Sequence, residues 1–207
     1  MPAHAFELDA GRDELIELSM DSAIWERVFT VAPLVLVATK EGDGHNVAPK
    51  HLAMPIGWAN FFGFVCSPSH ATYRNLQRHP EFTVSFPGLD RLVPASMAAG
   101  ARLDDRSKPT LAAVPVFPAR RVEGVLVEGC SLYLECELDR MVDGFGENSL
   151  LVGRVVAAAA ARAALRGHDV DDSDLLHRLR PLVYLYPGRV AEVCETHAFP
   201  FPVDYRR

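Results

Sequence analysis

The chain has 207 residues, of which 49% are apolar and 23% charged, and this ordinary composition excludes a disordered, collagen-like or coiled-coil protein. A formal net charge of −6 provides no global positive field for nucleic acid or an anionic membrane, so an anionic ligand would need a local site. The length favours one large domain spanning residues 1–207, and no repeat or Gly/Ser linker divides it.

The first 30 residues predict a helical extension. Asp21 can cap a turn in which Ile24, Trp25 and Val28 form an apolar stripe. We expect this stripe to pack against the main body of the protein.

Nothing in the chain predicts secretion or a membrane span. The acidic N-terminus lacks the apolar segment of a secretion signal. The most apolar stretch, 149–165, is interrupted by Arg154 and Arg162 and is too short to cross a bilayer. The four cysteines stand apart without a Cys-x-x-Cys motif, so we expect reduced, buried thiols and a cytoplasmic protein.

Short apolar or alternating runs follow from residue 33 onward and predict strands. Residues 41–46 (EGDGHN) predict the turn of a hairpin. Because strands outnumber helices and do not alternate with them, a closed or split antiparallel barrel is favoured over a parallel α/β sheet. The expected strands cover 34–39, 61–67, 82–86, 131–138, 150–156, 182–186 and 189–194.

Two helices are expected between the strands. The first covers 69–79, with Ser69 as its cap and Pro80 just beyond its end, and the second covers 171–181, with acidic residues in its first turn. Between them, 88–129 is expected to be a long irregular segment, which in a compact domain is often functional or covers a partner surface.

Several common site signatures are absent. The acidic stretch 169–180 has Arg180 where a calcium loop needs a bidentate glutamate, and no histidines stand at metal-ligand spacing, so no metal site is expected. The pair Gly42-x-Gly44 lacks the third glycine of a dinucleotide fingerprint, because Val47 stands there. The sequence has neither a nucleophile elbow nor a P-loop, so it does not favour an ordinary hydrolase or NTPase function.

The junction FVCSPSHATYRN combines the end of a strand with the start of a helix. A helix N-terminus offers unpaired N–H groups and a positive dipole end, which together suit a phosphate. The alternative is that Ser69 merely caps the helix while Thr72 and Asn75 face solvent. The polar side chains around this junction are Ser67, Ser69, His70, Thr72 and Asn75.

Lys50 and His51 are adjacent polar residues within an apolar strand segment, 46–55. Neighbours in a strand face opposite sides, so one of the two points into the barrel or a cleft, where a basic group needs an anion or a polar partner. The alternative is that both are edge-strand charges that discourage sheet pairing.

Taken in order, these segments resemble the flavin reductase family of FMN-binding split barrels, which is similar to the reductase components of two-component monooxygenases. The matching segments span roughly residues 32–156, and the combination of the unit from Thr72 to Val84 with GCSLYLECEL is specific. Within this span the segments are PLVLVAT, DGHNVAPKH, SPSHATYRNLQRHPEFTVSFP, VEGCSLYLECEL and LLVGRVV, and the closing PLVYLYPGRVAEV is also similar.

This resemblance implies a mainly β protein: a Greek-key antiparallel split barrel with a few helices, forming a homodimer with FMN near the subunit interface. It also implies an NAD(P)H-dependent oxidoreductase that reduces flavin by hydride transfer to N5 and can serve a monooxygenase partner. Two alternatives remain open, because fold and cofactor do not guarantee turnover. One is an FMN-binding module for storage, sensing or electron transfer, and the other is an interaction scaffold without flavin.

The resemblance also assigns site residues. Ser67, Ser69, His70, Thr72 and Asn75 match the segment that contacts the FMN phosphate and ribityl chain. Ala48, Pro49, Lys50 and His51 match the strand along the isoalloxazine ring. A cation near N1 favours the reduced flavin, and the candidates are Lys50, His51 and Arg154, the first two being the expected catalytic residues.

Overall fold

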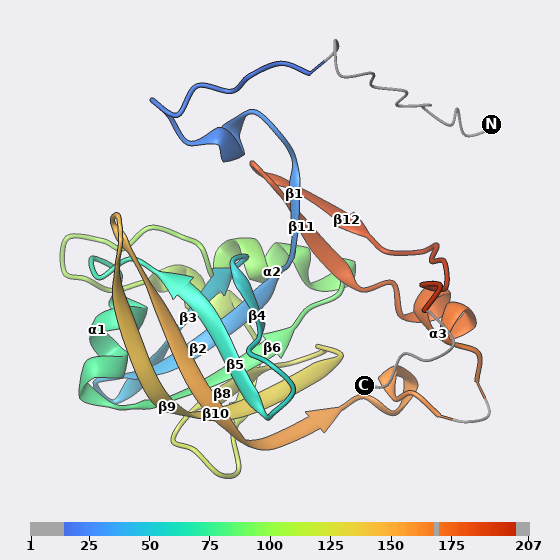
Figure 1. The fold of residues 1–207 in the computed structure, drawn as a ribbon. Coiled ribbons are helices and arrows are strands. Elements are labelled where there is room, and N and C mark those ends of the chain that lie inside the picture. Colours follow the sequence, from blue (N-terminus) through green and yellow to red (C-terminus); the bar gives the residue numbers. More distant parts are fainter. Residues whose placement is uncertain (1–14, 168–169, 202–207) are drawn as a thin grey trace.

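The computed structural model describes residues 15–167 and 170–201. Its main body is one antiparallel sheet in the order β3-β2-β6-β9-β10-β5-β4, curled into a half-barrel (Figure 1). This confirms the mainly β, barrel-like fold with few helices. The strands are β2 (Val35–Glu41), β3 (Gly44–Lys50), β4 (Ala53–Pro55), β5 (Phe61–Cys66), β6 (Glu81–Phe86), β9 (Leu132–Phe145) and β10 (Asn148–Ala160).

The core lies inside this curl, and β2 is buried on both of its faces. Val35 and Val37 pack inward with a cluster that includes Phe64 and Phe82. The intervening residues, typified by Leu36, join a second cluster on the outer face, which is covered by α2 and β8. The uninterrupted apolar run of β2 follows from this two-sided burial.

Two hairpins of the main sheet, β2–β3 and β9–β10, test the predicted strands and turn. Gly42, in the turn between β2 and β3, has a φ of +57°, which glycine adopts without steric cost, and this confirms the predicted hairpin. β9 and β10 extend beyond the expected ranges 131–138 and 150–156, because polar residues and the alanine run 157–160 continue the pairing outside the core.

The helices are α1 (Ala71–Arg78), α2 (Leu92–Met97) and α3 (Asp172–Leu179). The expected cap of α1 is wrong: His70 occupies the N-cap position without a side-chain bond, and the Ser69 hydroxyl pairs instead with that of Ser67. In α3, Asp171 accepts two backbone N–H bonds, which confirms a helix that begins with acidic residues.

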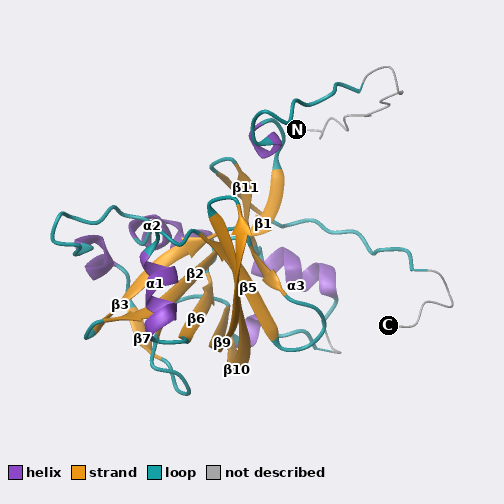
Figure 2. Ribbon diagram, turned by 60° about the vertical axis from the view of Figure 1, so that its left-hand side comes forward, coloured by secondary structure: helices purple, strands orange, loops and turns teal. Residues whose placement is uncertain are grey.

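A second, three-stranded sheet lies beside the barrel and consists of β1 (Thr30–Pro33), β11 (Leu182–Tyr186) and β12 (Arg189–Glu192), in the order β1-β11-β12. Figure 2 shows α1 and α2 on one side of the barrel and α3 on the other.

The segment 88–129 is only partly irregular, in contrast to the prediction, and 98–108 and 119–124 are its loops. It contains α2, two short 3₁₀ turns and a small hairpin of β7 (Val116–Pro118) and β8 (Val125–Val127). These strands have three residues each and α2 carries Pro94 in its first turn, so the sequence shows no periodicity there.

The expected helical extension is wrong for the part of 1–30 that the structure describes; residues 1–14 lie outside the described residues. Residues 15–30 hold only a 3₁₀ turn, Ile24–Glu26, before β1 begins. The side chains of Trp25 and Val28 are exposed rather than packed on the barrel. Asp21 does not cap this turn, since its carboxylate accepts a bond from Ser19 instead.

All four cysteines are free thiols, in agreement with the expected reduced state, but only Cys66, Cys130 and Cys136 are buried; Cys194 is exposed, contrary to the expectation. Within the described ranges, no helix has the length and apolar character needed to cross a membrane.

Candidate functional site

A cleft of about 440 Å³ lies where the N-terminus of α1 faces β3. The loop 98–108 forms its third wall, so part of the segment 88–129 borders the site. We call it the α1 cleft. It is lined by Asn46, Ala48, Pro49, Lys50, Ser69, His70, Ala71, Thr72, Arg74, Ala98, Ala99, Gly100, Arg102 and Lys108.

The first turn of α1 supplies backbone donors to this cleft. The chain leaves β5 at Cys66 and enters the helix through His70, which is extended and occupies the N-cap position without a side-chain bond. The first N–H groups of the helix have no acceptor within it, and the positive end of the helix dipole lies with them. Ser67 holds the entry turn by accepting the Ser69 N–H at 3.2 Å, but its side chain lies outside the cleft lining.

Lys50 is the buried cation of the α1 cleft. Its residue is only 8% exposed, and its Nζ donates to Sγ of Cys66 at 3.3 Å. Nδ1 of His70 lies 3.9 Å from the same sulfur. Burial, and then the charges of Lys50 and Arg74, lower the pKa of His70, so this imidazole favours its neutral form.

The loop 98–108 adds two further cations, which the sequence analysis missed. Nη2 of Arg102 donates to the Glu41 carboxylate at 2.8 Å and to Oδ1 of Asn46 at 3.1 Å. Nζ of Lys108 donates to the backbone carbonyls of Ala98 at 2.6 Å and Val47 at 2.9 Å.

These contacts place Lys108 in a strongly perturbed environment. Burial, followed by the positive charge of Arg102, lowers the pKa of Lys108 to about 8; Lys50 acts in the same direction and Glu41 opposes it. Four cations (Lys50, Arg74, Arg102 and Lys108) therefore line a cleft in a chain whose net charge is negative.

Thr72 and Asn75 are both buried, so the alternative in which they face solvent is wrong. Thr72 lines the cleft, and its Oγ1 accepts a bond of 3.4 Å from Nδ2 of Asn46. Asn75 does not line the cleft. Its Nδ2 donates to Oγ1 of Thr39 at 3.0 Å, which ties α1 to β2.

His51 points away from the cleft. Its ring stacks on Tyr184 of β11 with a centroid distance of 4.3 Å, and burial followed by the Lys50 charge lowers its pKa. Lys50 and His51 thus face opposite sides as expected, and the burial of Lys50 excludes the alternative of two exposed edge charges. Arg154 lies over the ring of Phe61 at 5.5 Å and is also absent from the cleft lining.

The structure therefore gathers six of the expected site residues and separates three from them. Ala48, Pro49 and Lys50 of β3 face Ser69, His70 and Thr72 at the start of α1. Ser67, His51 and Asn75 lie outside the lining. Chemically, this set of cations, hydroxyls and free backbone N–H groups can hold a phosphate-like anion.

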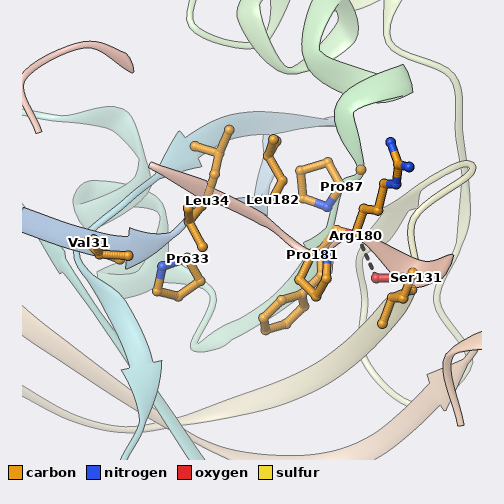
Figure 3. A pocket seen from close by; sticks show the side chains of 13 residues that line it. Val31, Pro33, Leu34, Pro87, Ser131, Arg180, Pro181 and Leu182 are labelled. Atoms are coloured by element: carbon orange, nitrogen blue, oxygen red, sulfur yellow. Dashed lines mark hydrogen bonds between the residues drawn. The ribbon is translucent and has the colours of Figure 1, made fainter. Parts of the chain in front are cut away.

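A second cavity, of about 350 Å³, lies between β1, β11 and the barrel (Figure 3). Pro33, Leu34 and Leu182 are among its mainly apolar lining residues. At one end Ser131 donates to the Phe86 carbonyl at 3.2 Å. This cavity lacks the concentration of cations and free donors found in the α1 cleft, which makes the α1 cleft the better candidate.

Comparison with protein families gives one match, to the flavin reductase like domain over residues 28–190. Two uncharacterized archaeal proteins are also similar. That of Pyrococcus abyssi (strain GE5 / Orsay) is 25% identical over 133 residues, covering 64% of this chain and 76% of that protein. That of Methanothermobacter thermautotrophicus is 27% identical over 131 residues, covering 60% of this chain and 61% of that protein.

Solved structures share the fold at low identity. Flavoredoxin from Methanosarcina acetivorans superposes with a TM-score of 0.74 at 17% identity, covering 92% of this chain and 97% of that one. Nitrilotriacetate monooxygenase component B from Bacillus cereus superposes with a TM-score of 0.71 at 20% identity, covering 82% and 88% of the two chains.

Proposed function

The chain belongs to the flavin reductase-like domain family, and from this premise we propose that it binds FMN in the α1 cleft and reduces it with NAD(P)H. Membership supports a flavin-related oxidoreductase. The observation that carries the finer proposal is the set of four cations, three of them from outside α1, that share a cleft with the free N–H groups of a helix N-terminus. The volume of about 440 Å³ is within the range of small-molecule sites.

The phosphate of FMN is assigned to the α1 end of the cleft. There the N–H groups of the first helical turn are free, and Ser69 and Thr72 offer hydroxyl groups. Arg102 and Lys108 complete the anion site from the opposite wall. A phosphate monoester carries close to two negative charges at neutral pH, which matches this density of cations.

The flavin ring is assigned to the β3 side of the cleft. Ala48 and Pro49 provide a flat apolar strand surface, and Lys50 places a buried cation beside it. Bound FMN would supply N5 as the acceptor of a hydride from nicotinamide C4. The role of Lys50 is to favour negative charge on the flavin, because a buried cation interacts with an anion more strongly than an exposed one does.

The alternative is a flavin-binding protein without NAD(P)H turnover, used for storage, sensing or electron transfer; a scaffold that binds no flavin is the third possibility. A titration of the purified protein with FMN, followed by absorbance at about 450 nm and by flavin fluorescence, tests binding. Anaerobic addition of NADH or NADPH to the loaded protein then tests reduction. Bleaching supports the reductase, binding without bleaching supports the module, and absence of binding contradicts both.

We also propose a homodimer. Leu52, Met54 and Trp58 are large apolar residues in and beside β4, an edge strand of the main sheet, and all are more than half exposed. An apolar edge of this kind is typical of a surface that a partner covers. Sedimentation velocity measures the mass directly, and a monomer at micromolar concentration with FMN present would contradict the proposal.

A monooxygenase is the proposed recipient of the reduced flavin. The support is the shared fold with a monooxygenase component B. Adding an acceptor monooxygenase to the reduced protein and following flavin transfer by gel filtration tests this step.

A further inference from the structure

A separate cavity of about 560 Å³ lies on another part of the barrel, between the β7–β8 hairpin and the ends of β9 and β10. None of its lining residues lines the α1 cleft. We call it the alanine pocket. It is lined by Phe117, Arg120, Arg121, Leu126, Cys130, Tyr133, Glu135 and the alanines 157–161.

Glu135 fixes one rim of this pocket. The residue is only 6% exposed, and its Oε2 accepts the backbone N–H groups of Arg120, Arg121 and Val122 at 3.0, 2.6 and 3.2 Å. All three recorded bonds end on the same oxygen. A buried carboxylate held by three N–H groups is well satisfied, so the loop that provides them is rigidly anchored on β9.

This anchor presents two consecutive arginine side chains at the mouth of the pocket. Arg120 and Arg121 are exposed, and neither side chain makes an ion pair with any described residue. The backbone bond from Ala119 N to Gly124 O closes the same loop at 2.9 Å. Two guanidinium groups on a fixed loop can bind a carboxylate, because a guanidinium group donates two parallel hydrogen bonds to the two carboxylate oxygens.

The body of the pocket is apolar and suited to a flat ring. Phe117 and Tyr133 stand edge to face with centroids 5.4 Å apart on one wall. The floor beside Tyr133 is the alanine run 157–161 of β10, in which Ala159 pairs directly with Tyr133 and Ala157 with Glu135, and the small side chains leave the space open. Tyr133 accepts the Cys130 N–H at 2.9 Å, so its own hydroxyl hydrogen remains available to an acceptor.

We propose that the alanine pocket binds a planar aromatic carboxylate, with its ring against Phe117 and the alanine run and its carboxylate at Arg120 and Arg121. This ligand site is independent of the α1 cleft. The arginines and the Tyr133 hydroxyl give it selectivity for an anion, and Glu135 holds the arginine loop in position without contacting the ligand.

The test uses the full chain labelled with ¹⁵N and titrated with 1-naphthoate, with the neutral 1-naphthamide as the matched ligand. We expect 1-naphthoate to shift the amide signals of residues 120–122 and 135, and 1-naphthamide to bind at least about tenfold more weakly, because the neutral amide cannot form the charge-assisted bonds of the carboxylate. Equal affinities for the two ligands would overturn the proposal.

Variants test whether Arg120 and Arg121, rather than other surface groups, bind the carboxylate. Arg120→Gln combined with Arg121→Gln is expected to weaken 1-naphthoate about tenfold or more and to leave 1-naphthamide unchanged. Arg78→Gln, at an exposed position on α1, is the matched control and should change neither. Ala159→Leu fills the open surface at an exposed alanine on the same sheet face as Tyr133 and should abolish binding of both ligands.

Two further measurements, the effect of FMN on naphthoate affinity and the mass of the double arginine variant, complete the test. The same affinity for 1-naphthoate in free and FMN-saturated protein supports a separate site, and displacement of FMN would overturn it. If FMN fails to bind, the proposed function fails while the naphthoate result stands. If the double arginine variant changes the mass measured by sedimentation, the pocket belongs to a contact between copies of the chain, and the ligand site is rejected.

Discussion

Nζ of Lys50 lies 3.3 Å from Sγ of Cys66, so the cation of β3 reaches across to the end of β5 beneath the α1 cleft. The next residue, His51, turns to the other side of the strand and stacks on Tyr184. Lys50 thus borders the cleft, whereas the adjacent His51 joins the barrel to the three-stranded sheet. The two residues therefore give different expectations when replaced.

Lys50→Met is expected to lower the reduction potential of bound FMN. Removing a buried cation destabilises the reduced flavin, which carries more negative charge than the oxidised flavin. Each tenfold loss of differential binding corresponds to about 30 mV for a two-electron couple. Spectroelectrochemistry measures this shift. His51→Gln is the control and should leave the potential within error; a larger shift in the control than in Lys50→Met would reverse the assignment.

Thr72→Ala is expected to weaken FMN binding by about 1–2 kcal/mol, because a hydroxyl at the phosphate end is lost. Riboflavin has the same ring without the phosphate and should lose little affinity. Flavin fluorescence titrations measure both constants. Equal losses for the two ligands would place the effect at the ring or in the fold rather than at the phosphate.

Asn75→Ala is expected to behave differently, although Asn75 is only one helical turn from Thr72. Its bond to Thr39 is buried, so the variant leaves a hydroxyl without its donor and lowers the free energy of unfolding by about 1–3 kcal/mol. Urea denaturation measures this loss. Selective weakening of FMN over riboflavin, with unchanged stability, would show that Asn75 reaches the ligand after all.

The sequence predicted the strands that line the core. Residues 34–39 form an apolar run because β2 is buried on both faces, and residues 82–86 alternate because Phe82 and Val84 face the core. Both patterns are local. The polar continuation of β9 and the alanines of β10 carry no such signal. Their extended structure comes from mutual pairing, which only the three-dimensional arrangement reveals.

The candidate site was predictable only where it is built from contiguous residues. The helix N-terminus and the pair Lys50 and His51 are visible in the sequence, because strand alternation and helix geometry act over a few residues. Arg102 and Lys108 reach the cleft through the path of a loop that crosses β3, and no short-range pattern encodes that path. Similarly, helical spacing does not show which way Asn75 faces.

Gly153→Ala is expected to lower the free energy of unfolding by about 1–3 kcal/mol through overpacking. A Cβ atom at Gly153 would lie 2.4 Å from the ring of Phe82 and 3.0 Å from the Glu137 carbonyl, at the point where β9 and β10 shift register. Gly44→Ala is the matched control, because its Cβ would approach only the Glu41 carbonyl, at 3.8 Å. Thermal unfolding compares the two, and equal stabilities would contradict the expected clash.

FMN affinity is expected to fall as the pH rises above about 8, where Lys108 loses its proton in the free protein. A bound phosphate favours the ammonium form, so binding raises the pKa of Lys108 and takes up a proton between about pH 8 and the raised value. Affinity is therefore greatest below this window and declines through it. Fluorescence titrations from pH 7 to 10 measure the slope, with riboflavin as the correction for ionisation of the ring.

The Lys108→Met variant is expected to bind FMN more weakly at pH 7 and to lose this part of the slope. The contribution of Lys108 to folding stability cannot imitate this fall in FMN affinity, because that contribution increases as the pH rises. The folded-state pKa of Lys108 is lowered from 10.5, so the unfolded chain binds more protons between about pH 8 and 10.5, and this residue makes the free protein more stable as the pH rises through that window. An unchanged slope in Lys108→Met would assign the pH dependence to another group.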